Sequence, residues 1–502
     1  MKRLITTLLP LLLAACTAKV PQEYREISEK PAIWPDYADI TVPANIAPLN
    51  FRIKCPGEKF VTRYSAGNTA ISVKGGKTGI PESEWKKLLG GGGPVTVDIF
   101  ARLNDEWIHY MPISINVAEP IDNYISYRLI PPSAVSYEGL TINQRDLTSF
   151  KEKVIYSNSL VQKGESGQCI NCHHYSNYKT DNMQFHARQY KGGTILVIDG
   201  ELRKVNLKTD STLSAGVYPA WHPYQDCIAY STNSTKQSFH LSDPNRTEVY
   251  DLASDLILYD IRQNSVSPIE NDPDQFECFP AWAPDGKTLY YVSAYLQVPD
   301  SVIRESWLID NSRQFHYDIY AKPFNPETME WQPSRKIFDA AAIGRSATFP
   351  RISPDGRYMI FTLGEYGVFH IWHRDADLYI MDLSDGSVRP LDEINSNDVE
   401  SYHSWSSNGK WIIFSSRRDD GGYTRLYLSH FGVDGKFSKP FALPQKDPDF
   451  ANQFMRSYNI PEFMTEPVSI SAHKFARFIN RHSAEPVSYT TKKEIQAPTD
   501  SI

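Results

Sequence analysis

The residues with the clearest chemistry lie in one short segment, Cys169-Ile170-Asn171-Cys172-His173. Two cysteines three positions apart, with a histidine directly after the second, are the attachment signature of a c-type haem. Thiols at this spacing reach the two vinyl groups of one porphyrin, and the adjacent imidazole becomes the proximal iron ligand. The segment therefore predicts one covalent haem held by Cys169 and Cys172, with His173 on the iron.

Two other interpretations use the same residues. A structural zinc site would combine both cysteines with two of His173, His174 and His186. A redox dithiol or a local disulfide would need only Cys169 and Cys172. The chain has six cysteines in 502 residues, so a chance match to the haem motif is rare and haem is favoured.

A second axial ligand for the iron is expected close to the motif. Met183 and His186 follow His173 at a short distance in the sequence. Methionine raises the reduction potential of a haem, and a second histidine gives a lower one. We expect Met183 to be the distal ligand, with His186 as the alternative.

The N-terminus indicates the compartment. Lys2 and Arg3 precede the apolar run 4–15, which ends in Leu-Ala-Ala before Cys16. A charged start, a short apolar run and small residues at its end are typical of a secretory signal. The cysteine at the cleavage point resembles the lipobox of bacterial lipoproteins, which implies a signal over 1–15 and a lipidated Cys16. Such a lipid tethers a protein to a membrane without spanning it.

The same segment predicts where the protein is attached. No acidic run follows Cys16, so we expect an anchor facing the periplasm, in the outer membrane. This extracytoplasmic location agrees with the haem motif, because haem c is attached outside the cytoplasm. No later segment has the eighteen or so continuous apolar residues of a membrane helix.

Charge and the remaining cysteines set further limits. Without the two basic residues of the signal, 50 Lys and Arg stand against 59 Asp and Glu, a net charge of −9. This balance argues against nucleic acid as a partner. Cys55, Cys227 and Cys278 are left over, and their odd number leaves the pairing open.

Internal repeats dominate the second half of the chain. Four segments share an aromatic residue, usually a proline, a hydrophobic residue and a tight turn: 218–223, 279–286, 349–356 and 402–409. Each is followed by an apolar strand, a polar loop and a second strand. Small antiparallel sheets of this kind bury their faces by stacking around an axis, as in a β-propeller.

The repeats resemble those of TolB-like β-propellers, which carry an aromatic-Pro-x-hydrophobic-Ser-Pro-Asp-Gly turn and a later Asp-Leu/Ile-Tyr strand. The first copy has Tyr224-Gln225 in place of Asp-Gly, and the fourth has Ser-Ser-Asn before its glycine. The resemblance implies an all-β fold with a propeller of about six blades and an envelope partner.

The expected domains follow from these patterns. Alternating runs broken by Gly and Pro before the motif suggest a β-sandwich-like domain. The predicted order is a tether at 16–44, the sandwich at 45–135, a haem segment at 136–193, the propeller at 194–465, and a helix with a tail at 466–502.

Three Phe-His dipeptides fall in loops between paired strands, at His240, His316 and His370. Loops of this kind share one face of a propeller. We therefore interpret the three histidines as part of a docking face for a partner.

Together these features predict a lipid-anchored, mono-haem, cytochrome c-like protein that transfers single electrons outside the cytoplasm, with the propeller as docking scaffold. One alternative is a TolB-like envelope scaffold with a sensory or non-redox role. The other is a periplasmic haem oxidoreductase, an analogy at the level of the fold alone.

Overall fold

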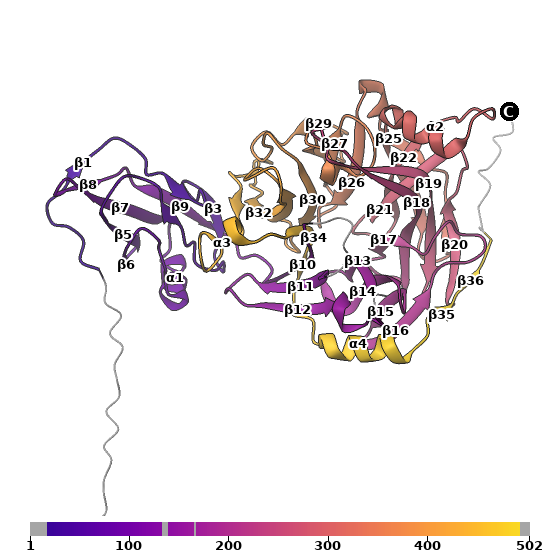
Figure 1. Ribbon diagram of the computed structural model, residues 1–502, viewed down its shortest axis with the longest axis horizontal. Helices are drawn as coiled ribbons and strands as arrows, with labels where there is room; N and C mark the ends of the chain where they lie inside the picture. The colour runs from indigo at the N-terminus through magenta and orange to yellow at the C-terminus, as the bar shows by residue number, and fades with distance from the viewer. Residues whose placement is uncertain (1–17, 133–138, 165–166, 492–502) are drawn as a thin grey trace, which may run out of the picture. The chain divides into compact units, whose positions relative to one another are not determined.

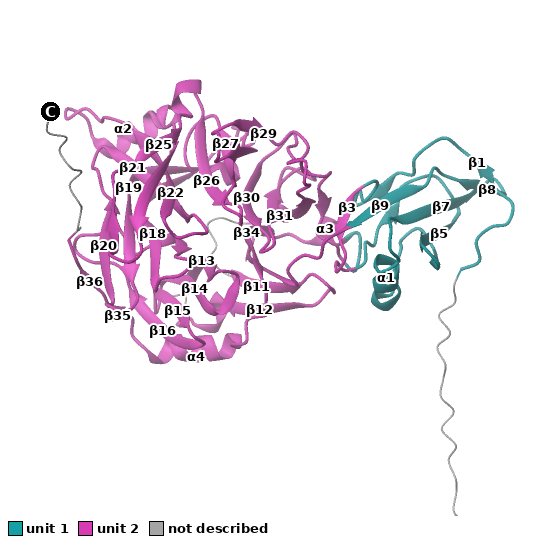
Figure 2. Cartoon of the chain, turned by 180° about the vertical axis from the view of Figure 1, so that it is seen from behind, with its two compact units in different colours: residues 1–39, 48–117, 446–449 teal, residues 40–47, 118–445, 450–502 magenta. Residues whose placement is uncertain are grey.

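The structure is a computed structural model that describes residues 18–132, 139–164 and 167–491. It contains two compact units, shown in different colours in Figure 2. Unit 1 comprises residues 1–39, 48–117 and 446–449, and unit 2 comprises 40–47, 118–445 and 450–502. The predicted signal, Cys16 and the end of the tail lie outside the described residues.

Unit 1 is built on one main sheet whose strands run in the order β1-β8-β7-β5-β6, with β9 also paired to β7. Its strands are β1 (Arg25–Glu26), β5 (Lys59–Ala66), β6 (Thr69–Lys74), β7 (Val95–Leu103), β8 (Glu106–His109) and β9 (Ile113–Ala118). Beside it are the short pair β2 (Ile33–Trp34) and β4 (Arg52–Ile53), and the helix α1 (Glu82–Leu89).

This unit differs from the expected sandwich. Among the described residues, only the two-stranded β2–β4 pair accompanies the main sheet, and helix α1 packs beside β5 and β6. Part of the predicted tether is also folded, since the amide of Ala18 donates to the carbonyl of Ser72 at 3.1 Å and β1 pairs with β8.

Unit 2 is all-β with a propeller arrangement, and the four sequence repeats form four blades (Figure 1). The first two blades are β17 (Val217–Trp221), β18 (Cys227–Phe239), β19 (Thr247–Asp260) and β20 (Ser265–Glu270), then β21 (Gln275–Trp282), β22 (Thr288–Tyr295), β23 (Asp318–Asn325) and β25 (Arg335–Phe338), with β24 (Glu330–Trp331) beside β23. The next two are β26 (Ser346–Ile352), β27 (Tyr358–Gly364), β28 (Asp377–Asp382) and β29 (Val388–Pro390), then β30 (Glu400–Trp405), β31 (Trp411–Ser416), β32 (Arg425–His430) and β33 (Phe441–Ala442).

The repeat motif marks the turn between the first two strands of a blade. Gly286 and Gly356 adopt φ values of 68° and 75°, which glycine reaches without steric cost. The preceding aspartates, Asp285 and Asp355, accept hydrogen bonds from the amides two residues later, at 2.9 and 3.1 Å. The predicted Asp-Gly turns are therefore confirmed.

Two further sheets are formed mainly by strands that precede the repeats in the chain, and each is completed by one strand that follows the repeats. One has the order β12-β11-β10-β34, with β10 (Tyr124–Ile130), β11 (Thr141–Asp146), β12 (Glu152–Ser157) and β34 (Ser457–Met464). The other has the order β13-β14-β15-β16-β35, with β13 (Gln168–Ser176), β14 (Lys179–Gln189), β15 (Gly193–Ile198), β16 (Glu201–Asn206) and β35 (Glu485–Pro486).

These sheets change two expectations. The repeat blades number four, which differs from the six implied by the family resemblance. The predicted haem segment is not a separate piece between domains, because the cysteine motif lies inside strand β13 of a regular antiparallel sheet.

The innermost strands follow one another in space. Strand β13 contacts β17, and the series continues through β21, β26 and β30 to β34, which contacts β13 again. Strand β34, from the end of the chain, pairs antiparallel with β10 from its first third, from Tyr124 opposite Met464 to Ile130 opposite Ser457. The last inner strand thus joins the first sheet and closes the series.

All six inner strands carry the same irregularity. In each, the ladder skips two residues, and the first of these has a positive φ: Cys172 (55°), Tyr218 (49°), Phe279 (52°), Phe349 (53°), Tyr402 (42°) and Ile460 (50°). We call these six residues the bulge layer. The residue after the bulge has no ladder partner, which explains why proline is tolerated there at 219, 280, 350 and 461.

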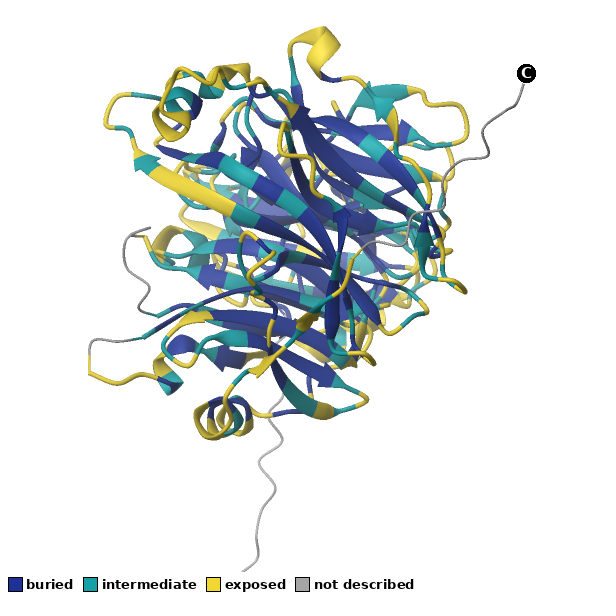
Figure 3. Cartoon of the chain, turned by 90° about the vertical axis from the view of Figure 1, so that its right-hand side faces the viewer, coloured by how far each residue is buried: buried dark blue, intermediate teal, exposed yellow. Residues whose placement is uncertain are grey.

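The predicted C-terminal helix is confirmed as α4 (Ala472–Arg481). Its Phe475 and Ile479 are buried in the same core cluster as Tyr156 and Phe185. In Figure 3 the strands of unit 2 are mostly buried and the loops between them exposed.

Candidate cofactor-binding cavity

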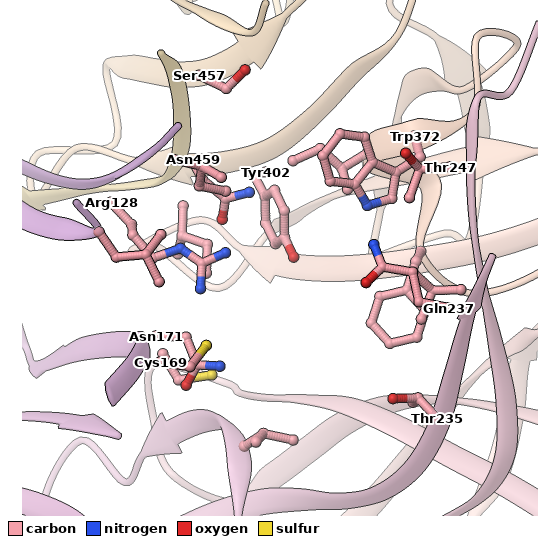
Figure 4. Close-up of a pocket in the computed structure, with 18 of the residues that line it drawn as sticks. Arg128, Cys169, Asn171, Thr235, Gln237, Thr247, Trp372, Tyr402, Ser457 and Asn459 are labelled. Atoms are coloured by element: carbon pink, nitrogen blue, oxygen red, sulfur yellow. The ribbon is translucent and has the colours of Figure 1, made fainter. Parts of the chain in front are cut away.

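Unit 2 contains a cavity of about 840 Å³ at one end of the inner strands. This volume is in the range of pockets that hold organic cofactors. Figure 4 shows Arg128, Cys169 and Asn171 on one side of the cavity, with Gln237, Thr247 and Trp372 across from them. The cavity lies on one side of the bulge layer, since Cys172, Tyr218, Tyr402 and Ile460 line it, and no residue immediately after them does.

Both cysteines of the motif line this cavity. In a regular strand, residues three apart point to opposite faces. The bulge at Cys172 resets that alternation, so Cys169, Asn171 and Cys172 all reach the same cavity. The carbonyl of Cys172 is held by Gln184, whose Nε2 donates to it at 2.5 Å. Burial raises the pKa of the Cys172 thiol, which favours its protonated form.

The bulge itself does not require a cysteine. The five equivalent positions hold tyrosine, phenylalanine or isoleucine. The fold therefore does not account for a cysteine at this position.

His173, the predicted proximal ligand, is not among the residues that line the cavity. It is buried near Ile460 and Glu462 of β34, and burial lowers its pKa to about 4. Within the described residues, neither ring nitrogen makes a hydrogen bond of normal geometry. His173 occupies the unpaired position after the bulge, which is also the position of His403 in β30.

The two distal candidates are placed differently. Met183 is fully buried in the core cluster around Tyr156 and Phe185 and does not line the cavity. His186 lines the cavity, and its Nδ1 lies 3.1 Å from the hydroxyl of Thr194. Metal-binding histidines are typically oriented in this way, through a hydrogen bond at the nitrogen that does not bind the metal. Burial lowers the pKa of His186 to about 3, which keeps the ring neutral and able to bind a metal.

Cationic side chains in the cavity were missed by the sequence reasoning. Arg128, Arg188 and Arg246 line it, and no Asp or Glu is among its described lining residues. Arg128 is also held in place, because its Nη1 donates to the carbonyl of Ile170 at 3.2 Å. A cavity of this charge favours an anionic ligand. The signal was weak in the sequence, because the three arginines are far apart along the chain.

The proposed histidine face is only partly compatible with the structure. His370 is fully buried, with Nδ1 2.9 Å from the hydroxyl of Thr348 and Nε2 3.1 Å from the carbonyl of Tyr366. It is therefore a core residue, and its inclusion in an exposed docking face was wrong. His316 is half-buried, and His240 lines the 840 Å³ cavity.

The other described cysteines and potential metal ligands form no second site. Cys227 and Cys278 are buried, Cys55 is half-buried, and no disulfide joins the described cysteines. No group of three or more His, Cys, Asp or Glu suited to a metal ion occurs among the described residues. In the same part of the chain, no helix is long and apolar enough to cross a membrane.

The residues at the cavity fit a covalent haem in most respects. Two thiols, one oriented imidazole and three arginines meet there, and the carboxylates of a haem would find cationic partners. The position of His173 does not fit, because His173 does not line this cavity. His186 is the imidazole placed to replace it.

Comparisons with known proteins give similarity of fold alone. No family model and no curated protein matches the chain. Among solved structures, a DUF4784 family protein from Bacteroides caccae matches at 9% identity and TM-score 0.29, over 72% of this chain and 95% of that one. The Niastella koreensis GH74 enzyme matches at 11% identity and TM-score 0.38, over 64% and 46%. A prolyl oligopeptidase B from Galerina marginata matches at 8% identity and TM-score 0.35, over 75% and 43%.

The chain spans about half the length of the first such structure, a puromycin-hydrolyzing peptidase from Mycobacterium tuberculosis, at 52% coverage of that protein. These similarities are too distant to assign any activity.

Proposed function

We propose that this protein is a lipid-anchored, extracytoplasmic β-propeller that carries one covalent haem c in the 840 Å³ cavity and transfers single electrons. The observation that carries the proposal is the bulge at Cys172. It brings two thiols three residues apart onto one cavity, which a regular strand would prevent.

We assign the chain's own residues as follows. Cys169 and Cys172 would form the thioether links, and His186 would bind the iron through Nε2, with its Nδ1–H donating to Thr194. This assignment replaces His173 and Met183, which do not line the cavity. A haem so held supplies a one-electron change at its iron, with a potential set by its ligands and its burial.

The remaining lining residues would position the group and control its surroundings. Arg128 and Arg188 would pair with the haem carboxylates, and Tyr218 and Tyr402 of the bulge layer would close the cavity at its inner end. Charged partners in the cavity would lower the cost of burying the carboxylates.

The proposal also includes the number of blades and the location of the protein. The closed contact series of six inner strands, each with one bulge, supports a ring of six blades in which the β10–β12 and β13–β16 sheets join the four repeats. The lipobox-like sequence at Cys16 supports an anchor in the outer membrane, facing the periplasm.

The test is covalent haem content. Full-length protein produced with the haem-attachment machinery should gain the mass of one haem and give a c-type pyridine haemochrome spectrum. The double variant Cys169→Ser/Cys172→Ser should lose both signals, and Cys55→Ser in unit 1 should keep both. Wild-type protein without added tetrapyrrole would disprove the proposal.

The ligand assignment has its own readout. His186→Ala should change the spin state and the Soret band of the attached haem, whereas His173→Ala should leave both unchanged. The reverse result would return the iron to His173 while keeping the covalent haem.

A further inference from the structure

A second cavity, of about 460 Å³, lies on the opposite side of the bulge layer from the first. Its lining includes the second residue after each bulge, and these six residues form one layer across the inner strands: His174, Ala220, Ala281, Arg351, Ser404 and Glu462. The layer is asymmetric, because two alanines leave space where the other positions carry polar or charged side chains.

The wall of this cavity is mainly aromatic and apolar. Trp221, Trp282 and Trp405, at the third position after their bulges, all line it, together with several prolines. The indole nitrogens of Trp282 and Trp405 already donate to backbone carbonyls of the neighbouring strand, at 3.1 and 3.3 Å. These two rings therefore offer the cavity apolar surface without a free donor.

Of the charged side chains in this layer, Arg351 has more N–H donors than its described hydrogen bond uses. Its described hydrogen bond runs from Nη1 to the carbonyl of Pro350 at 3.1 Å, while a guanidinium has five N–H donors. Within the described residues, no carboxylate lies within ion-pair distance of Arg351. Burial lowers the pKa of Arg351, which shows that its surroundings disfavour an unpaired charge.

The nearby acid is already engaged. Glu462 is in hydrogen-bond contact with His174, since its Oε1 lies 2.8 Å from Nδ1 of the imidazole. Glu462 acts on Arg351 only through its charge, at longer range. Glu462 would repel a doubly charged anion such as phosphate more strongly than an anion with one negative charge, so a singly charged ligand suits the layer better.

We infer that this second cavity binds an organic monocarboxylate with an aromatic or branched apolar body. Arg351 would take the carboxylate in its bidentate fork, and the indoles and prolines would enclose the apolar part. The space left by Ala220 and Ala281 receives that part. The site is separate from the proposed haem cavity and does not depend on it.

The experiment compares two matched probes on the full-length protein. N-acetyl-L-phenylalanine carries the carboxylate, and N-acetyl-L-phenylalaninamide has the same body without the charge. Isothermal titration, with tryptophan fluorescence as a second readout, should show the acid binding at least tenfold more tightly than the amide. Equal affinities, or no binding of either probe at millimolar concentration, would overturn the inference.

The residue assignment is tested by Arg351→Gln, which should weaken binding of the acid at least tenfold and leave binding of the amide unchanged. Arg357→Gln is the matched control, since Arg357 is exposed and pairs with Asp382 outside the cavity. Unchanged affinity in folded Arg351→Gln would contradict the assignment. Should that variant fail to fold, the wild-type comparison of acid with amide still decides.

Discussion

At the scale of single residues, the key feature is that Cys172 stands where the other inner strands carry an aromatic residue or isoleucine. The backbone at this position is set by the propeller, because all six bulge residues have φ values between 42° and 55°. The fold therefore does not fix which side chain stands at position 172. The thiol of Cys172 lines the same cavity as Cys169. The proposed haem site is thus a substitution within a repeated structural position.

Glu277 provides a prediction at the same scale. It is almost fully buried on β21, and its Oε2 has no hydrogen-bond partner among the described residues. Burial, followed by the charges of Asp255 and Glu270, raises its pKa to about 9. The folded protein therefore holds a proton on Glu277 at neutral pH, whereas the unfolded chain releases it above about pH 4.3.

The sign of the pH dependence follows. Between about pH 4.3 and 9 the unfolded state binds fewer protons at this site, so Glu277 makes the free energy of unfolding fall as pH rises. Glu277→Gln removes this effect. We expect the variant to exceed wild type in unfolding free energy by about 1 kcal/mol or more at pH 8, and by little at pH 4.5.

Thermal and denaturant unfolding at both pH values measure the effect. Exposed Glu327→Gln is the control and should leave the pH dependence unchanged. A difference for Glu277→Gln that is the same at both pH values would refute the raised pKa.

At the scale of elements, helix α4 is held by its cap and by one buried face. The side chain of Ser471 accepts from the amide of Lys474 at 3.2 Å, which satisfies one of the free donors of the first turn. The helix then buries Phe475, Ala476 and Ile479 against the core beside β12. A weak periodicity in the sequence was enough to predict it, because one apolar face and one cap define a short helix.

We expect Ser471→Ala to lower the unfolding free energy by about 1 kcal/mol, because it removes the cap. Ser471→Asp should retain nearly the full unfolding free energy of wild type. A carboxylate also caps the helix, and its negative charge interacts favourably with the helix N-terminus. Denaturant titration measures both. An alanine variant as stable as wild type would show that the cap contributes nothing here.

At the scale of the whole molecule, closure depends on β34. This strand supplies the sixth inner strand and pairs with β10 along its length. Tyr458 of β34 also packs edge-on against Tyr127 of β10, with ring centroids 4.8 Å apart. Without β34, the edge of β10 and the flank of β30 would both be exposed, and open strand edges promote aggregation.

Three truncations test the role of closure. A chain ending at residue 455 lacks β34 and should aggregate or unfold without a cooperative transition. Chains ending at 468 and 491 keep β34, and the first of these loses Ile470, α4 and the short strands after it. Both should elute from size-exclusion chromatography in the same oligomeric state as the full-length protein. A soluble, cooperative 455 variant would show that the ring closes without its last strand.

Sequence alone determined the elements whose signals are local. The four repeats, their Asp-Gly turns and helix α4 are confirmed, because turns, alternation and caps are encoded over a few neighbouring residues. The covalent haem, the lipid anchor and electron transfer remain predictions from short sequence patterns.

Only the tertiary structure decided which residues meet. It placed the cysteine motif in strand β13 of an antiparallel sheet and Met183 in the core. It also brought His186 and three arginines around the thiols and formed the second cavity around Arg351. None of these could be read from spacing, because the register shift at each bulge reverses which face a side chain occupies, and ring closure joins strands more than three hundred residues apart.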